Sequence, residues 1–161
     1  MKTIYLAGGC FWGTQKFIDQ FEGVLSTEVG YANGNSANPA YEEVCRGSGH
    51  AETVKVVYDE TILSTVKLLQ YYFMTIDPTS VNRQGGDTGI QYRTGIYYED
   101  KTLLSDIKTA VREEQEKYDR PLAVEVKHLE NFYTAEEYHQ KYLDKNPGGY
   151  CHIPAKLMEM A

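Results

Sequence analysis

A glycine-rich turn between an apolar segment and an amphipathic segment constrains the fold of this chain more than any other feature. The turn is Gly-Gly-Cys-Phe-Trp-Gly at residues 8–13. The apolar residues 4–7 before it predict a buried strand, and residues 14–21 after it predict a helix. The two glycines permit the backbone torsions of a tight strand-to-helix connection. We therefore expect Cys10 at the N-terminus of the helix, where the helix dipole favours thiolate over thiol.

The local pattern allows two interpretations of this cysteine. Phe11 and Trp12 place two large aromatic surfaces beside its sulfur, which is enough to wall a small apolar pocket. A cysteine that follows two glycines can equally be a small buried hydrophobic residue at a turn. Residues 8–13 alone leave both interpretations open.

Length and charge restrict the class of protein. With 161 residues and a mass of 18.3 kDa, the chain is long enough for one hydrophobic core and too short for two domains. It carries 16 basic and 23 acidic residues, a net charge of -7, and no basic tract, so nucleic acid and anionic membranes are poor candidate partners. The apolar run at residues 4–7 is well short of the roughly 7 to 15 residues in the apolar region of a signal peptide. With three cysteines and no secretory leader, we expect a cytoplasmic protein with reactive thiols.

The remaining segments alternate between strands and helices. This alternation predicts an α+β fold in which helices pack on a mixed β-sheet. Two irregular stretches, 33–50 and 79–92, interrupt the pattern. Long irregular stretches usually belong to a functional site or are disordered, and we expect a site at 33–50. The first includes a possible helical turn at 41–46. The strands are expected at 2–7, 25–32, 52–58, 92–98 and 122–129, of which 122–129 is the last. The helices are expected at 14–21, 65–76, 102–118 and 134–143, the last of them from a Thr134/Glu137 capping box.

Strand 52–58 places a carboxylate toward the interior. Val54, Val56 and Tyr58 alternate onto one face, and the same parity puts Glu52 on that face. A carboxyl group that loses water has a raised pKa and can carry a proton near neutral pH. The alternative is that Glu52 lies in water at a frayed strand end and titrates normally.

Residues 8–13 resemble the signature of the peptide methionine sulfoxide reductase A family, in which the cysteine of this motif is the nucleophile. Segments 38–45, 49–52, 87–93 and 146–151 also match the family's pattern, in the family's order, and span nearly the whole chain. The resemblance implies a single catalytic domain, 1–161, with a ferredoxin-like core. It implies a peptide-methionine (S)-S-oxide reductase that acts on free or protein-bound methionine sulfoxide without cofactor or metal.

The same resemblance implies a role for each matching residue. Reduction of a sulfoxide requires a nucleophile at sulfur, proton donors at oxygen and an apolar socket for the methyl group. The implied site has Cys10 as the nucleophile, Glu52 as the acid, Tyr41 and Tyr92 as donors that hold the oxygen, Phe11 and Trp12 around the methyl group, and Asp87 at the pocket.

The resemblance also implies how the enzyme is recycled. Attack leaves Cys10 as a sulfenic acid, with which Cys151, on a flexible tail at 145–161, would condense to a disulfide that thioredoxin then reduces. Many family members have a further cysteine in the tail, whereas this chain has none after Cys151, so thioredoxin would attack the Cys10–Cys151 disulfide itself. Cys45 follows Val44 in a short apolar turn; we expect it to be buried and inert, and it is the second candidate for the resolving thiol. We expect a monomer.

Three other interpretations of Cys10 and the histidines are open. In the first, the protein is a binding domain in which Cys10 is only packed. In the second, it is a cysteine hydrolase with His50, His139 or His152 as base, although nothing in the sequence places a histidine near Cys10. In the third, Cys10, His139 and the Cys151-His152 pair hold a metal ion, although no Cys-x-x-Cys or His-x-x-x-His pair is present.

Overall fold

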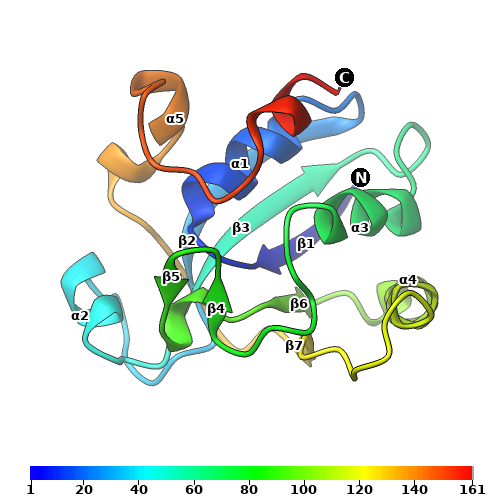
Figure 1. Ribbon diagram of the computed structural model, residues 1–161, viewed down its shortest axis with the longest axis horizontal. Helices are drawn as coiled ribbons and strands as arrows, with labels where there is room; N and C mark the ends of the chain where they lie inside the picture. The colour runs from blue at the N-terminus through cyan, green and yellow to red at the C-terminus, as the bar shows by residue number, and fades with distance from the viewer. Residues whose placement is uncertain (161) are drawn as a thin grey trace.

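A six-stranded sheet forms the centre of the computed structural model, which describes residues 1–160 (Figure 1). The strands are ordered β7-β6-β1-β3-β2-β8, and neighbouring strands are antiparallel except for the parallel pair β6 and β7. A separate two-stranded hairpin pairs β4 with β5. The strands are β1 Lys2–Ala7, β2 Val24–Ala32, β3 Ala51–Tyr58, β4 Arg83–Gln84, β5 Asp87–Thr88, β6 Gly95–Tyr98, β7 Glu125–His128 and β8 Phe132–Thr134.

Helices alternate with these strands along the chain. Short 3-10 turns occur at Ile90–Tyr92, Lys101–Leu103, Glu137–His139 and Ala155–Glu159. The α-helices are α1 Phe11–Asp19, α2 Tyr41–Cys45, α3 Thr65–Phe73, α4 Leu104–Gln115 and α5 Tyr142–Lys145.

The central part of the sheet has ferredoxin-like topology. Apart from the short α2 and the hairpin β4–β5, the chain runs β1, α1, β2, β3, α3, β6, which is strand-helix-strand-strand-helix-strand. The four strands lie in the order β6-β1-β3-β2. The predicted α+β fold with a mixed sheet is confirmed. The strands β7 and β8 extend this core at its two edges.

The main hydrophobic core lies between the sheet and its helices. Strand residues that alternate onto one face, such as Leu6 and Val54, pack in one cluster with Ile18 of α1, Leu69 of α3 and Ile107 of α4, all of them 0% exposed. The opposite face holds a smaller cluster that Phe132 of β8 helps to cover. This alternation follows from the two-residue period of a strand and the amphipathic stripes of the helices.

Several predicted boundaries change in the structure. The helix predicted at 65–76 ends at Phe73, and the strand predicted at 92–98 begins at Gly95. The sequence prediction missed β8, which pairs with β2 immediately before the predicted capping box. Thr134 ends this strand and caps no helix, so the helix predicted at 134–143 is replaced by a 3-10 turn and the short α5.

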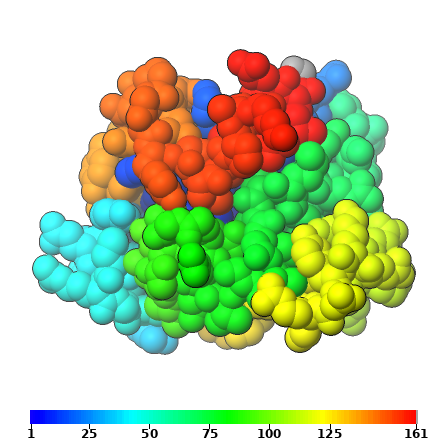
Figure 2. Space-filling view, in the orientation of Figure 1, coloured from blue at the N-terminus to red at the C-terminus, as the bar shows by residue number. Residues whose placement is uncertain are grey.

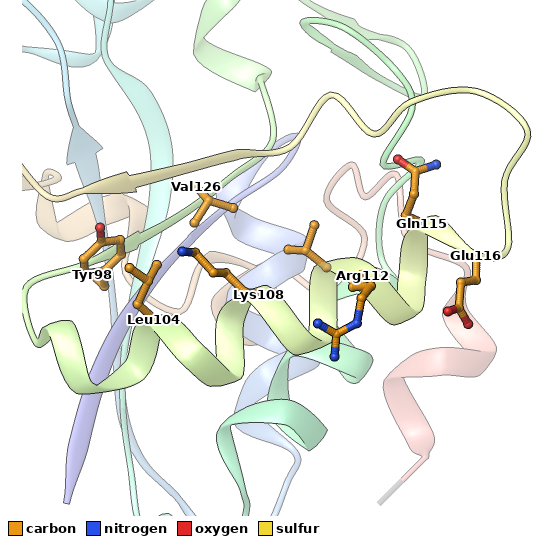
Figure 3. Close-up of a pocket in the computed structure, with 8 residues that line it drawn as sticks. Tyr98, Leu104, Lys108, Arg112, Gln115, Glu116 and Val126 are labelled. Carbon is orange, nitrogen blue, oxygen red and sulfur yellow. The ribbon is translucent and has the colours of Figure 1, made fainter.

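A groove of about 610 Å³ lies between α4 and the neighbouring edge of the sheet (Figure 3). Tyr98, Leu104 and Val126 form part of its wall, and none of its lining residues belongs to the site predicted from the sequence.

No helix within residues 1–160 combines the length and the apolarity needed to cross a membrane. The described part of the chain also has no group of three or more His, Cys, Asp or Glu residues that could hold a metal ion.

Candidate active site

The glycine turn places Cys10 at the start of α1, as predicted. Strand β1 ends at Ala7, and Gly9 turns the chain with a positive φ of 73°. The N–H of Gly9 donates a hydrogen bond of 3.1 Å to the carbonyl of Tyr92, which ties the turn to the second irregular stretch. Cys10 is the N-cap residue of α1. A side-chain-bearing residue would be strained at the φ of Gly9, which explains why glycine precedes this cysteine.

Burial raises the pKa of the Cys10 thiol, contrary to the sequence-based expectation. Cys10 is 7% exposed, and loss of water together with the nearby Glu52 carboxyl disfavours the thiolate. The backbone N–H of Trp12 at the helix N-terminus acts in the opposite direction and is outweighed. These surroundings therefore favour the thiol form of Cys10 over the thiolate.

Glu52 faces the interior beside Cys10, as the alternation of β3 predicts. Its side chain is 1% exposed, and its Oε1 accepts a 3.2 Å hydrogen bond from the backbone N–H of Phe11. Burial is the main cause that raises the pKa of Glu52 to about 8, and the charge of Asp87 contributes. Its other oxygen, Oε2, is buried without a hydrogen-bond partner in the described structure. At neutral pH this carboxyl is mostly protonated and has an oxygen left for a ligand.

Tyr41 and Tyr92 bring two neutral hydroxyl groups to the same place. Burial raises the pKa of each, and the charge of Glu52 is the next cause for both, which places both hydroxyls within electrostatic reach of Glu52. Tyr41 is the first residue of α2, and its backbone N–H donates to Oε2 of Glu136 at 3.1 Å. The Tyr31 hydroxyl donates to Oε1 of the same carboxylate at 2.8 Å. Glu136 thus fixes the start of α2. The Tyr41 side chain hydrogen-bonds with Cys45, and the raised pKa values keep the hydroxyls of Tyr41 and Tyr92 protonated, so both can act as donors.

The aromatic part of the site is held by residues that sequence reasoning did not assign. The indole N–H of Trp12 donates to Nδ1 of His139 at 2.9 Å, and the Trp12 ring stacks on Tyr142 with centroids 3.8 Å apart. His139 also lies between the rings of Phe11 and Tyr41 and is 1% exposed. Burial lowers the pKa of His139, so it stays neutral and accepts from Trp12. The aromatic and histidine residues clustered at 138–142 were the available signal for this contact.

Asp87 lies on β5 beside the turn. Burial raises its pKa, and the nearby backbone N–H of Cys10 and the hydroxyl of Tyr150 partly oppose this. Its Oδ2 is buried without a hydrogen-bond partner in the described residues. Asp87 therefore links the hairpin, the turn and the tail at the edge of the site.

The tail carries Cys151 onto α1. Figure 2 shows the orange and red residues of the tail lying across the blue N-terminal region, and Figure 1 shows the same segment passing α1. Cys151 is half-buried, and its Sγ accepts from the backbone N–H of Ile153 at 3.4 Å. Ile153 is 4% exposed and anchors the segment in the main core. Ala161, the last residue of the predicted flexible tail 145–161, lies outside the described residues.

The three cysteines differ in exposure, and one prediction about them is wrong. All are free thiols, and Cys45 is exposed, whereas the apolar turn around it predicted burial. The reason is that Val44 points into the core from the short α2 and its neighbour Cys45 points out.

A groove of about 430 Å³ lies at Cys151 between Lys16 of α1 and Met158 of the tail.

The histidines do not form a hydrolase arrangement. Nδ1 of His139 is occupied by Trp12, and Nε2 of His50 lies 2.7 Å from the carbonyl oxygen of Ser36. His152 packs against Gly9, and burial lowers its pKa. No histidine contacts the Cys10 sulfur through a hydrogen bond within residues 1–160.

Known proteins share both the sequence and the fold of this chain. The family model "Peptide methionine sulfoxide reductase" matches residues 2–161. Peptide methionine sulfoxide reductase MsrA of Lachnoclostridium phytofermentans is 64% identical over 153 residues, which cover 94% of this chain and 92% of that protein. The reduced form of Mxr1 from Saccharomyces cerevisiae has a TM-score of 0.88 at 38% identity, covering 93% of this chain and 88% of Mxr1. Mxr1 in complex with Trx2 has a TM-score of 0.62 at 25% identity, covering 88% and 84%. The chain therefore belongs to the peptide methionine sulfoxide reductase family.

Proposed function

We propose that the protein reduces the S epimer of methionine sulfoxide, free or in proteins, with Cys10 as nucleophile, Cys151 as resolving thiol and thioredoxin as reductant. The observation that carries the proposal is the buried Glu52, whose Oε2 has no partner beside the Cys10 thiol. A protonated acid next to a thiol matches the needs of sulfoxide reduction. The sulfur must be attacked, and its oxygen must be protonated before it can leave.

In the first half-reaction, Glu52 donates its proton to the sulfoxide oxygen while Cys10 attacks sulfur. Protonation makes the substrate sulfur electrophilic and leaves Glu52 as a carboxylate that can accept the thiol proton. A bond forms between the two sulfur atoms, and the oxygen then passes to Cys10. The products are methionine, reduced by two electrons, and a Cys10 sulfenic acid, oxidised by two. The raised pKa values of both groups support this neutral starting state.

The surrounding residues would orient the substrate. The hydroxyls of Tyr41 and Tyr92, kept neutral by burial, would donate to the oxygen that Glu52 protonates. Phe11 and Trp12 would hold the S-methyl group, with the Trp12 ring fixed by His139 and Tyr142. Asp87, with its free Oδ2 at the edge of the site, would contact the polar part of the substrate.

In the second half-reaction, Cys151 attacks the sulfenic sulfur of Cys10. The S–S bond forms, the S–O bond breaks, and water leaves with the thiol proton. The known complex of Mxr1 with Trx2 supports thioredoxin as the partner that reduces this disulfide. We place the enzyme in the cytoplasm, where thiols are kept reduced. We propose that it acts there as a monomer.

The function is tested by measuring turnover of each methionine sulfoxide epimer, free and in a peptide, with dithiothreitol and with thioredoxin. We expect turnover of the S epimer with both reductants and only background reduction of the R epimer. A chiral sulfur presents its oxygen to Glu52 and its methyl group to Trp12 in one configuration only. Equal rates for the two epimers would contradict the proposed arrangement of acid and socket.

Cys151→Ser is expected to separate the two half-reactions. The variant should release one methionine per enzyme at the normal rate and then stop with thioredoxin, because no disulfide forms for thioredoxin to attack. Quantifying methionine in a burst experiment checks this, and dithiothreitol should restore turnover by reducing the sulfenic acid directly. Normal steady-state turnover with thioredoxin would move the resolving role to the exposed Cys45.

A further inference from the structure

We propose that Gly13 is a positioning residue that leaves the space in which Cys151 approaches Cys10. This inference rests on the proposed role of Cys151 in resolving the sulfenic acid. It assigns a purpose to the last glycine of the turn motif, which binds neither the substrate nor the departing oxygen in the proposed mechanism.

Gly13 lies three residues after Cys10 in the first turn of α1. Residues three apart share one face of a helix, so the surface at Gly13 adjoins the surface at Cys10. The tail crosses α1 at this place. A Cβ atom built on Gly13 would lie 2.7 Å from Sγ of Cys151 and 3.1 Å from Cδ1 of Ile153. The Cys151 sulfur therefore rests where any other residue would place its side chain.

The need for glycine here concerns space and not backbone conformation. Gly13 is a buried residue inside a regular helix and has no positive φ, unlike Gly9. Glycine is a poor helix former, and alanine would be favoured at such a position in the absence of another demand. The packed Cys151 sulfur is that demand.

The tail is fixed after the contact, on the C-terminal side of Cys151. Ile153 is buried in the core, and the side chain of Gln20, the residue that follows α1, donates to the carbonyl of Leu157 at 2.8 Å. The backbone N–H of Met160 donates to the Gln20 side chain at 2.7 Å. Because the segment after Cys151 is held, an added methyl group at residue 13 would push Cys151 and Ile153 away from α1 together.

Displacement of Cys151 would slow disulfide formation selectively. A disulfide requires an S–S distance of about 2.05 Å and Cα atoms about 4.4 to 6.8 Å apart, so the attacking sulfur needs close access to Cys10. Misplacing a reacting group by about 1 Å costs on the order of 100-fold in rate. The first half-reaction does not use Cys151 and has no such requirement.

The test is Gly13→Ala, followed through each half-reaction separately. We expect methionine release in a single turnover to stay within about twofold of the wild type, while conversion of sulfenic acid to disulfide slows by about 10- to 100-fold. The sulfenic acid should persist long enough to be trapped by dimedone and seen by mass spectrometry. Turnover with thioredoxin should fall, and turnover with dithiothreitol should remain.

Gly148→Ala is the matched control. A Cβ atom at Gly148 would meet no atom of the described residues within 4 Å, and this glycine has no positive φ. The same chemical change three residues before Cys151 should therefore leave disulfide formation unchanged. A second check is the Gly13→Ala/Cys151→Ser double variant. With thioredoxin it should behave like Cys151→Ser alone, because the two substitutions act on one step.

Two results would overturn the role of Gly13. One is disulfide formation at the wild-type rate in Gly13→Ala, and the other is an equal loss in both half-reactions, which would place the effect on Cys10 itself. Neither result bears on the proposed resolving role of Cys151, because that role is tested separately by the Cys151→Ser variant. If Cys151→Ser turned over normally with thioredoxin, the proposed resolving role would fail whatever Gly13→Ala did.

Discussion

Cys10→Ser is expected to reduce methionine sulfoxide at no more than the uncatalysed rate with either thioredoxin or dithiothreitol. A serine hydroxyl is a hard and weakly acidic group that neither attacks the sulfoxide sulfur nor accepts its oxygen reversibly, whereas a cysteine that has given up its thiol proton does both. The change in volume is small at a residue that is 7% exposed, so the fold should remain. Loss of activity would then report on chemistry at one atom.

The exposed Cys45 offers the matched control for this substitution. Cys45→Ser removes an exposed thiol on α2 that hydrogen-bonds with the Tyr41 side chain, and serine keeps a hydrogen-bonding atom at this place. It should keep both the single-turnover burst and steady-state turnover. Thiol-dependent release of methionine by Cys10→Ser above that of an enzyme-free mixture would remove Cys10 from the role of nucleophile, and a loss in Cys45→Ser would implicate the second thiol instead.

The parts of the fold that could be predicted are those that local pattern determines. The apolar residues before the turn, the alternation in β3 and the stripe of α1 each lie within a few residues of one another, and the structure has these elements at or near the expected positions. The edge strand β8 is three residues long and exists because it pairs with β2, about a hundred positions earlier. No local pattern carries that information.

The same division applies to the site. The alternation of residues in β3 was enough to predict that Glu52 faces inward. The pKa of Cys10 depends on how much of the chain covers it, and the effect of burial outweighs that of the helix N-terminus. The contacts of His139 with Trp12 and of Glu136 with Tyr41 were missed because they join residues 127 and 95 positions apart. Helix end effects are local and predictable, whereas desolvation is a property of the whole fold.

Glu52→Gln is expected to slow the single-turnover reduction of methionine sulfoxide by about 100- to 10,000-fold, the usual contribution of a general acid. Glutamine keeps the shape and an acceptor for the Phe11 N–H, but it has no proton to give to the departing oxygen. Rapid-quench measurement of methionine in one turnover checks this step without interference from recycling. The exposed Glu43 of α2 provides the control, and Glu43→Gln should leave the rate unchanged.

The pH dependence distinguishes loss of an acid from damage to the site. The acid is protonated below its pKa of about 8, so the wild-type reduction rate should fall as the pH rises through that value, and Glu52→Gln should lack this limb. The stability of the wild type should also fall as the pH rises. Because the folded pKa lies above the ordinary 4.5, the native state binds more protons than the unfolded state between these values, and stability falls as the pH rises from 4.5 to 8. Glutamine removes this cost, so the variant should be more stable than the wild type at pH 8 by on the order of a few kcal/mol. A variant that is slower, pH-independent and harder to unfold cannot owe its slowness to misfolding, whereas an unchanged rate would assign the protonation to the tyrosines alone.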